Sequence, residues 1–164
     1  MNIMVQIGLF EFITRCQKTL QAPSGQGCVH SSLVCENPNI DICDAEDNPM
    51  FGNMTHFFPL NWRFLPIVDP QVDILLVRDL DSHISKREVM AVGEFLNSSY
   101  DFHVMRDHPN HDIQMLGGTW GVKRTKKVRQ ELLTSLKKML KDPKFYATRQ
   151  KAGPDQQILK KYIW

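Results

Sequence analysis

The stretch VDILLVRDLD, residues 72–81, joins a run of aliphatic residues to two closely spaced aspartates. The apolar residues of Val72–Val77 follow one another directly, which predicts a strand buried on both faces, as in parallel sheets. Asp79 and Asp81 come immediately after this predicted strand. Because ligands of open α/β sheets bind beyond the carboxyl ends of the strands, we expect both carboxylates at a binding edge.

The residues that follow this stretch predict helices and strands in alternation. Ser85 and Glu88 form a capping box, which predicts a helix that begins after Ser85. The alternation predicts the α/β class, with a mixed or parallel sheet flanked by helices. The predicted helix carries apolar residues at helical spacing, at Val89, Val92, Phe95 and Leu96. The elements predicted after it are a strand at Phe102–Met105, a basic helix from about Lys126 to Leu140 and a last helix near Pro154.

Before residue 40 the chain has the composition of a loop. Residues 17–39 are rich in Gln, Ser, Gly, Pro and Asn. Residues 1–39 are therefore predicted to be an irregular N-terminal segment, and residues 40–164 the folded domain. Within that domain a short strand is expected at Ile40–Cys43. The aromatic-rich residues 54–67 predict an irregular helix that stops before Pro66.

Composition excludes several classes of protein. Of the 164 residues, 42% are hydrophobic and 23% charged, which is typical of globular domains and not of disordered chains. No run approaches the roughly 20 apolar residues that a membrane helix needs. Residues 1–122 carry 7 Lys and Arg against 15 Asp and Glu, whereas residues 123–164 carry 13 against 3. We interpret the basic region as a solvated helix face, with an anionic-polymer surface as the alternative. No nucleic-acid partner is expected, because aromatic stacking groups are not interleaved with the basic residues.

The cysteines and the glycosylation sequons bear on the compartment. The cysteine spacings match no zinc pattern, so two disulfides and four buried thiols both remain open. The sequons Asn53-Met54-Thr55 and Asn97-Ser98-Ser99 favour the secretory lumen, with the cytoplasm as the alternative. The four cysteines are Cys16, Cys28, Cys35 and Cys43.

The pair Asp79 and Asp81 has the chemistry of a divalent-cation site. Two carboxylates one residue apart can converge on one hard cation, and Mn²⁺ or Mg²⁺ prefers such oxygens. The alternative is that one aspartate caps the following helix while the other is solvated. Haloacid-dehalogenase-type phosphohydrolases also carry D-x-D after a strand. The continuation Ser82-His83-Ile84 departs from their Gly-Thr or Thr-Val, so that family is the less favoured one.

Three motifs together resemble one family. Arg78-Asp79-Leu80-Asp81-Ser82, Met105-Arg106-Asp107-His108-Pro109 and Gly117-Gly118-Thr119-Trp120-Gly121 resemble segments of a largely uncharacterised group of GT-A-like glycosyltransferases. Trp62-Arg63-Phe64-Leu65-Pro66 and Val72-Asp73 resemble further segments of the same group. The resemblance covers about residues 35–164. Asp155-Gln156-Gln157-Ile158-Leu159 is similar to the D-Q-x-I-L segment of retaining family-8 glycosyltransferases. The likeness implies a Rossmann-related, GT-A-like fold and a nucleotide-sugar-dependent transferase.

The resemblance also implies roles for particular residues. Asp79 and Asp81 would hold Mn²⁺ or Mg²⁺ on the diphosphate of the donor, and Asp155 with Gln156 would line the catalytic sugar site. The acceptor would be a glycan or a protein. Substrate contacts are expected from Arg78, Asp107, His108, Gly117, Gly118 and Trp120.

Several of these residues have a structural interpretation as well. Arg78 is equally explained by pairing with a nearby acid, and Asp155 by charge at a helix N-terminus. Trp120 suits either a sugar-stacking surface or the core. His108 and His111 have the spacing of a zinc site, but a solvated or acceptor-binding loop is favoured over zinc.

The resemblance further implies that the domain is incomplete. GT-A folds begin with a β-α unit that binds the base and ribose, and no such unit is evident in residues 1–39. Family-8 enzymes place a histidine metal ligand downstream of D-Q-x-I-L, and Trp164 is reached first. A sheet without all its strands leaves an exposed edge that favours self-association. The alternative function is therefore a non-catalytic interaction module that retains the fold.

Overall fold

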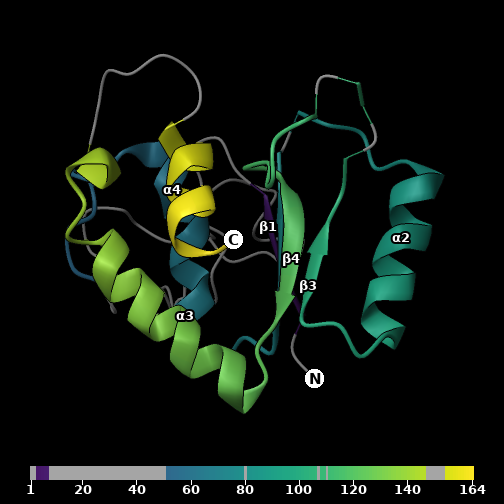
Figure 1. Cartoon of the computed structure of the whole chain (residues 1–164), viewed down its shortest axis with the longest axis horizontal. Coiled ribbons are helices and arrows are strands. Elements are labelled where there is room, and N and C mark those ends of the chain that lie inside the picture. Colours follow the sequence, from purple (N-terminus) through teal and green to yellow (C-terminus); the bar gives the residue numbers. More distant parts are fainter. Residues whose placement is uncertain (1–2, 8–50, 80, 107, 110, 147–153) are drawn as a thin grey trace, which may run out of the picture.

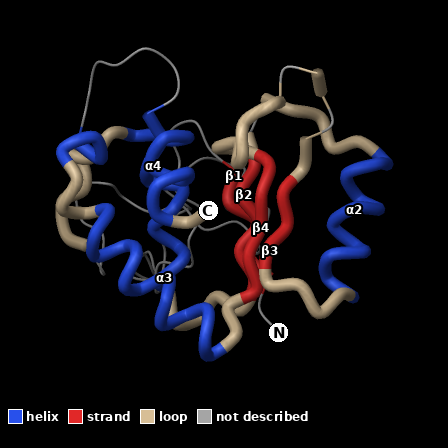
Figure 2. Tube along the Cα trace, in the orientation of Figure 1, coloured by secondary structure: helices blue, strands red, loops and turns tan. Residues whose placement is uncertain are grey.

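The chain folds as an α/β domain in which helices cover both faces of one sheet (Figures 1 and 2). The computed structural model describes residues 3–7, 51–79, 81–106, 108–109, 111–146 and 154–164. Helix α2 lies on one side of the sheet, and η1, α3 and α4 lie on the other. The helices are the 3-10 helices η1 (Pro59–Val68) and η2 (Pro143–Tyr146) and the α-helices α2 (Lys86–Asn97), α3 (Lys126–Met139) and α4 (Pro154–Tyr162). None of the helices described is long and apolar enough to cross a membrane.

The sheet is mixed. Its described strands run in the order β1-β2-β4-β3. β1 pairs with β2 in parallel, whereas β4 is antiparallel to both β2 and β3. The strands are β1 (Ile3–Ile7), β2 (Ile74–Arg78), β3 (Phe102–Val104) and β4 (Thr119–Lys123).

The strand predicted at Val72–Val77 is confirmed as β2, which is one of the two inner strands of the described sheet. Its residues are buried on both faces, with Leu76 the most accessible of them. Leu75 and Val77 point toward η1, α3 and α4, because both belong to the core on that side. Leu76 points the other way, since a Cβ on its partner Gly121 would meet Leu76 and Phe95 of α2. This alternation decides which side chains can share a site.

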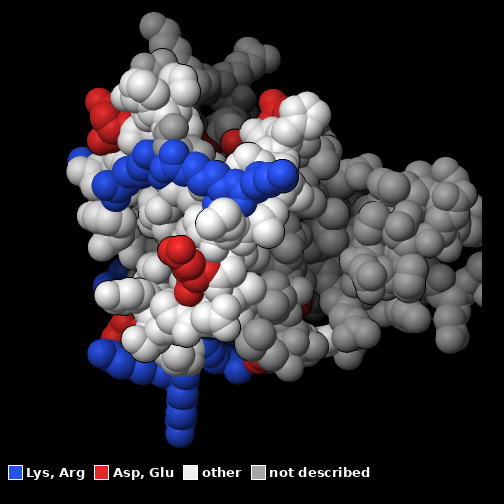
Figure 3. Space-filling model, turned by 90° about the vertical axis from the view of Figure 1, so that its right-hand side faces the viewer, with Lys and Arg blue, Asp and Glu red and all other residues white. Residues whose placement is uncertain are grey.

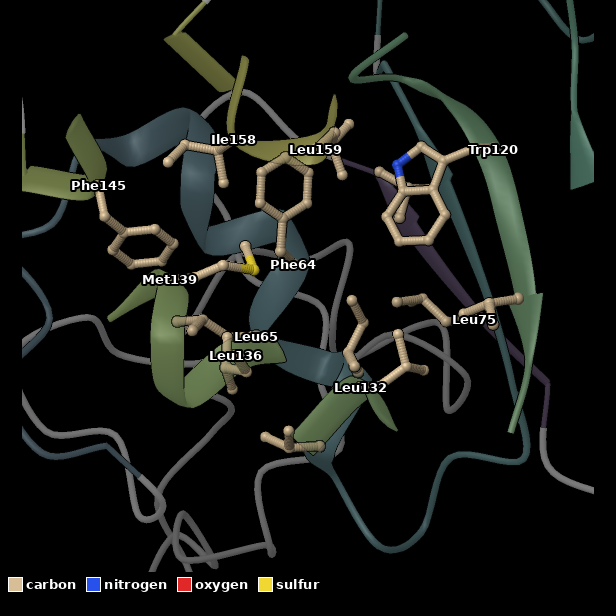
Figure 4. Close-up of a cluster of buried hydrophobic side chains, with 14 of the residues drawn as sticks. Phe64, Leu65, Leu75, Trp120, Leu132, Leu136, Met139, Phe145, Ile158 and Leu159 are labelled. Atoms are coloured by element: carbon tan, nitrogen blue, oxygen red, sulfur yellow. The ribbon is translucent and has the colours of Figure 1, made fainter. Parts of the chain in front are cut away.

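The main core lies between the sheet and the helices η1, α3 and α4 (Figure 4). Helix α3 contributes Leu132, Leu136 and Met139, and they meet Phe64 and Leu65 of η1. Burial of each such side chain contributes about 1.5–3 kcal/mol. Asn61 Nδ2 donates a hydrogen bond to the Phe145 carbonyl at 2.9 Å, which ties η1 to η2.

Three of the described elements were not predicted, namely β1, β4 and the short 3-10 helix η2. Ile3–Ile7 forms β1, so the expectation that residues 1–39 are irregular is wrong for these 5 residues. Thr119–Lys123 forms β4, which contains Gly121 and directly follows Gly117 and Gly118, so that the segment has the composition of a turn. The strand expected at Ile40–Cys43, the cysteines and much of the N-terminal segment lie outside the described residues.

The helix predicted within the aromatic-rich residues 54–67 corresponds to η1, but it ends later than predicted. The 3-10 helix η1 runs through Pro66 to Val68 instead of stopping before it. A proline φ suits 3-10 geometry, and Phe64, Leu65, Ile67 and Val68 are all buried around the ring. Burial on both sides of the proline thus outweighs the one hydrogen bond that its missing N–H removes.

Helix α2 begins as predicted but buries little. Ser85 Oγ accepts a hydrogen bond from the Glu88 N–H at 3.1 Å, which confirms the cap. Of the apolar positions predicted for this helix only Phe95 is buried, and Val89 is 61% exposed.

Asp142 fastens the last helix to the rest of the domain. Its carboxylate accepts hydrogen bonds from Lys161 Nζ at 2.7 Å and from Tyr162 Oη at 2.8 Å, both on α4. The Lys144 N–H also donates to it, at 2.9 Å. Hydrogen bonding, led by Lys161, lowers the pKa of Asp142 to about 2.

The stability of the domain should therefore fall between about pH 4 and pH 2. A carboxyl with a depressed folded-state pKa stabilises the fold above its unfolded pKa of about 3.9, and this contribution is lost as the pH falls through the folded value. We expect Asp142→Asn to cost about 1–2 kcal/mol at pH 7 and to flatten the pH dependence in that window. Urea unfolding at stepped pH measures both. A variant as pH-sensitive as the parent there would show that another group controls the transition.

Candidate functional site

Asp79 lies at the carboxyl end of β2, on the side of the sheet that carries η1 and α4. Arg63 Nη1 donates to Asp79 Oδ1 at 2.7 Å. The arginine side chain is only 6% exposed, whereas that of Asp79 is 39% exposed. A buried guanidinium therefore holds one oxygen of a carboxylate that still reaches solvent.

The loop before β2 places Arg63 against the end of this strand. Arg124 Nη1 donates to the carbonyls of Asp69 and Val72, which lie on either side of the turn between η1 and β2. Burial lowers the pKa of this guanidinium. The Gln71 N–H also donates to Asp69 Oδ1 at 2.8 Å, so both the Arg124 and the Asp69 side chains stabilise this turn.

Gly117 and Gly118 make room for two carboxylates. A Cβ on Gly118 would lie 2.2 Å from Asp79 Cγ, and a Cβ on Gly117 would lie 2.3 Å from Asp155 Oδ2. Real Cβ atoms essentially never approach that closely, so the carboxylates occupy the space that side chains would fill. Because consecutive Cα atoms are about 3.8 Å apart, the two glycines set both acids beside each other.

Arg63 also lies next to Asp155. A Cβ placed on Gly117 would lie 2.3 Å from Asp155 Oδ2 and 3.5 Å from Arg63 Nη1. The arginine and the aspartate thus lie close to the same point. Four segments far apart in the sequence therefore meet here, from η1, the end of β2, the start of β4 and the start of α4. In Figure 1, β4 and α4 both begin at the upper side of the domain.

The two acids have unequal environments. Burial raises the pKa of Asp155, and the nearby charge of Asp79 raises it further. The Gln156 N–H and the charge of Arg63 act in the opposite direction. Asp155 thus holds a proton more readily than an ordinary aspartate, while the neighbouring acid remains paired with arginine.

Of the residues expected at the site, Arg78 lies elsewhere. Its side chain points to the opposite face of the sheet, where Nη2 is 2.9 Å from Glu88 Oε2 of α2. Successive residues of a strand face opposite sides, so Arg78 and Asp79 diverge at this point. The local-pairing interpretation of Arg78 therefore fits the structure, with Glu88 as the partner.

Trp120 is a core residue. It is 1% exposed, and its ring centroid lies 6.2 Å from that of Phe64 (Figure 4). The expectation that its indole stacks on a sugar is corrected by this burial, since the ring packs among η1 and α4 side chains. Its position in β4, paired with Val77, explains why the ring points inward.

The other expected residues are peripheral or lie outside the described part of the chain. Asp81 and His108 are exposed, and Gln156 is half-buried beside Asp155. The rings of His108 and His111 lie 5.2 Å apart at their centroids. Asp107 lies outside the described residues.

A divalent cation would find a limited set of ligands. In the described part of the chain, no three acidic, histidine or cysteine side chains gather closely enough to hold a metal ion by themselves. Mg²⁺, however, commonly binds through one or two carboxylates and completes its shell with waters and phosphate oxygens. Asp79, which presents Oδ2 beside its arginine-bound Oδ1, fits that mode, and Asp81 two residues later is accessible.

Arg63 is the residue of this arrangement to which the sequence assigned no role, although its segment is one of those that resemble the GT-A-like group. It lies within the apolar run Trp62–Val68, where a charged side chain is out of place. Arginine is almost never fully buried unless it is paired, so its position in that run was the available signal. The identity of its partner depends on tertiary structure and is not written in the local sequence.

The close contact between Gly118 and Asp79 makes a sharp prediction. We expect Gly118→Ala to displace the Asp79 carboxylate and to cost about 1–3 kcal/mol, because the added methyl group has no room. Gly93→Ala is the matched control. It adds the same methyl group where no atom lies within 4 Å, and it should raise helix stability by about 0.5–1 kcal/mol. Thermal unfolding of dilute protein compares them. Equal shifts for the two variants would contradict the packing described here.

No family model, no curated protein and no solved structure matches this chain.

Proposed function

We propose that this chain carries a GT-A-like domain that transfers a sugar from a nucleotide diphosphate donor to a glycan or protein acceptor. The observation that supports the proposal is the meeting of Asp79, Asp155, Gly117 and Gly118 around Arg63. Asp79 and the two glycines belong to motifs that resemble the GT-A-like group, and Asp155 belongs to the segment that is similar to family-8 enzymes. The site lies beyond the carboxyl end of a central strand, where α/β folds bind their ligands.

Asp79 and Asp81 would hold Mn²⁺ or Mg²⁺ on the donor diphosphate. The cation would supply Lewis-acid stabilisation of the negative charge that develops on the leaving diphosphate. In this arrangement Arg63 keeps Asp79 in place through Oδ1. The carboxylate is thereby oriented before any ligand arrives, which lowers the entropy that binding must remove.

Asp155 would act on the sugar itself. Its carboxylate lies against Gly117 and close to Asp79, next to the proposed position of the diphosphate. As an anion it accepts hydrogen bonds from sugar hydroxyls and stabilises positive charge that builds on the anomeric carbon. Because its pKa is raised by burial, we expect activity to fall on acidification at a higher pH than an ordinary aspartate would give.

Calorimetric titration with uridine diphosphate tests the proposal. We expect binding in the presence of Mn²⁺, none after the metal is chelated, and at least tenfold weaker binding in Asp79→Asn, since one metal ligand loses its charge. Asp81→Asn should weaken binding as well. Glu131→Gln removes the same charge from the exposed face of α3 and should leave the titration unchanged.

The competing possibility is a non-catalytic module that has retained the fold. In that case neither uridine diphosphate nor a sugar nucleotide changes the Tm at any Mn²⁺ concentration. Binding that is indifferent to chelation, or to Asp79→Asn, would also contradict the proposed role of these carboxylates.

A further inference from the structure

Helix α2 presents an apolar surface that the described part of the domain does not cover. Val89 is 61% exposed and Met90 is 67% exposed, and Ile84 just before the helix is 66% exposed. Phe95 is the one residue of α2 that is buried. Two large apolar side chains on the outer face of a helix of 12 residues are unusual unless another surface packs on them.

Gly93 extends this surface and keeps it flat. Among the residues that the structure describes, a Cβ at this position would meet no atom within 4 Å, so none of their contacts requires glycine. Glycine in the middle of a helix is unfavourable relative to alanine, and a missing side chain allows another backbone to approach closely. Lys86, Met90, Gly93 and Asn97 follow one another at intervals of four, three and four residues, and therefore lie in one stripe along the helix.

Two of the exposed charges of this helix, Lys86 and Glu94, lie at equal distances from Met90, and Arg87 beside Lys86 is a further exposed cation. Lys86 lies one helical turn before Met90 and Glu94 one turn after it, and both are exposed. An antiparallel second copy of the helix would set each lysine opposite the glutamate of its partner. Figure 3 looks onto this side of the molecule, where largely uncharged surface carries both basic and acidic side chains.

We propose that α2 pairs with α2 of a second copy of this chain, antiparallel about a two-fold axis at Met90. Such an interface is isologous, so the same patch serves both subunits. Met90 packs on its counterpart, Val89 flanks it, and Gly93 admits the facing helix. Two Lys86–Glu94 pairs fix the direction and register, in the way that charges beside a helix seam do in coiled coils.

This interface is independent of the proposed transferase site. Helix α2 covers the opposite face of the sheet from η1 and α4 (Figure 1). A helix of 12 residues is about 18 Å long, so the contact is small and the dimer is expected to be weak, with a Kd on the order of 0.1 mM.

Sedimentation of the full chain over a range of protein concentration tests the pairing. We expect the weight-average mass to rise toward that of a dimer. Met90→Glu, which places two carboxylates on the axis, should leave a monomer, and Glu94→Lys should weaken pairing about tenfold through like-charge contacts. The double variant Lys86→Glu/Glu94→Lys should restore it, because the pairs are reversed and not lost.

Glu131→Lys is the control, since it makes the same change of charge on the exposed side of α3. It should leave the dimer unchanged, and circular dichroism should show all variants folded. A wild-type chain that stays monomeric up to about 0.5 mM, five times the expected Kd, would overturn the proposal. So would a dimer that Glu94→Lys does not weaken, or one that the double variant does not restore. A monomer with α2 protected from solvent would indicate that another part of the chain covers this face.

Discussion

Replacing Arg63 with methionine is expected to lower the free energy of unfolding by about 2–4 kcal/mol. The substitution leaves the aliphatic volume in place but removes the buried cation that faces Asp79 and Asp155. Removal of one partner of a buried pair typically costs about 3–5 kcal/mol. We expect less because the Asp79 side chain is 39% exposed and water can solvate part of its charge. At this chain length such a loss lowers Tm by roughly 5–15 °C.

A double-mutant cycle separates lost charge from lost packing. Arg63→Met leaves the carboxylates of Asp79 and Asp155 without their neighbouring cation. Arg63→Met/Asp79→Asn removes one of these two negative charges, so it should be more stable than Arg63→Met alone. Arg63→Lys should recover part of the stability. Arg87→Met makes the same chemical change at an exposed position of α2 and should shift Tm little. Equal stability of the single and double variants would show that the arginine matters only as packing.

Asp155→Asn is expected to abolish most transfer activity and yet stabilise the fold at pH 7. Activity should fall about 10²–10⁴-fold, because the amide cannot stabilise a developing positive charge. The stability gain should be on the order of 1 kcal/mol, the size commonly seen when a functional group is replaced by one that suits the fold better. Asparagine keeps an oxygen that can accept the Gln156 N–H, so the start of α4 should remain intact.

The stability gain should depend on pH in one direction. Burial raises the folded-state pKa of Asp155, so the folded protein binds a proton more tightly than the unfolded chain does. The native state is therefore relatively most stable below the unfolded pKa of about 3.9, and that advantage is lost as the pH rises through the folded value. The free energies of unfolding of Asp155→Asn and the parent should therefore differ most at pH 7, and the difference should disappear below about pH 4. A constant difference from pH 3 to pH 7 would contradict a desolvated carboxylate at this position.

The elements predicted correctly are those that local sequence decides. Val72–Val77 predicted β2 because a continuous aliphatic run suits a strand buried on both faces. Ser85 and Glu88 predicted the start of α2 because a cap is a contact between near neighbours. The burial of α2 did not follow from its pattern, because Val89 faces outward regardless of its hydrophobicity.

The elements missed depend on partners distant in sequence. Thr119–Lys123 is a strand because Trp120 and Val122 pair with Val77 and Leu75, and its glycine content conceals this. Gly121 lies where the strand passes close to Leu76, since a Cβ would approach Leu76 Cδ2 to 2.6 Å and the Leu75 carbonyl oxygen to 3.1 Å. The local pattern of a strand is overridden here by tertiary contacts.

The sequence pointed to the acidic residues and glycines of the candidate site, but not to the role of its arginine, Arg63. Asp79, Asp155, Gly117 and Gly118 were all named from motifs, and the structure brings them together. Gly117 and Gly118 were expected to contact the substrate, whereas in the structure they make room for the two carboxylates. Arg78 and Asp79 are neighbours in sequence yet face opposite sides of the sheet, which only strand geometry reveals.

Anomalous X-ray scattering from crystals grown with Mn²⁺ and uridine diphosphate tests the central claim most directly. The proposed arrangement requires one manganese peak within coordination distance of an Asp79 oxygen, with the diphosphate bound to the same ion beside Gly118. A manganese peak elsewhere on the chain, or a nucleotide bound away from Asp79 and Asp155, would contradict it.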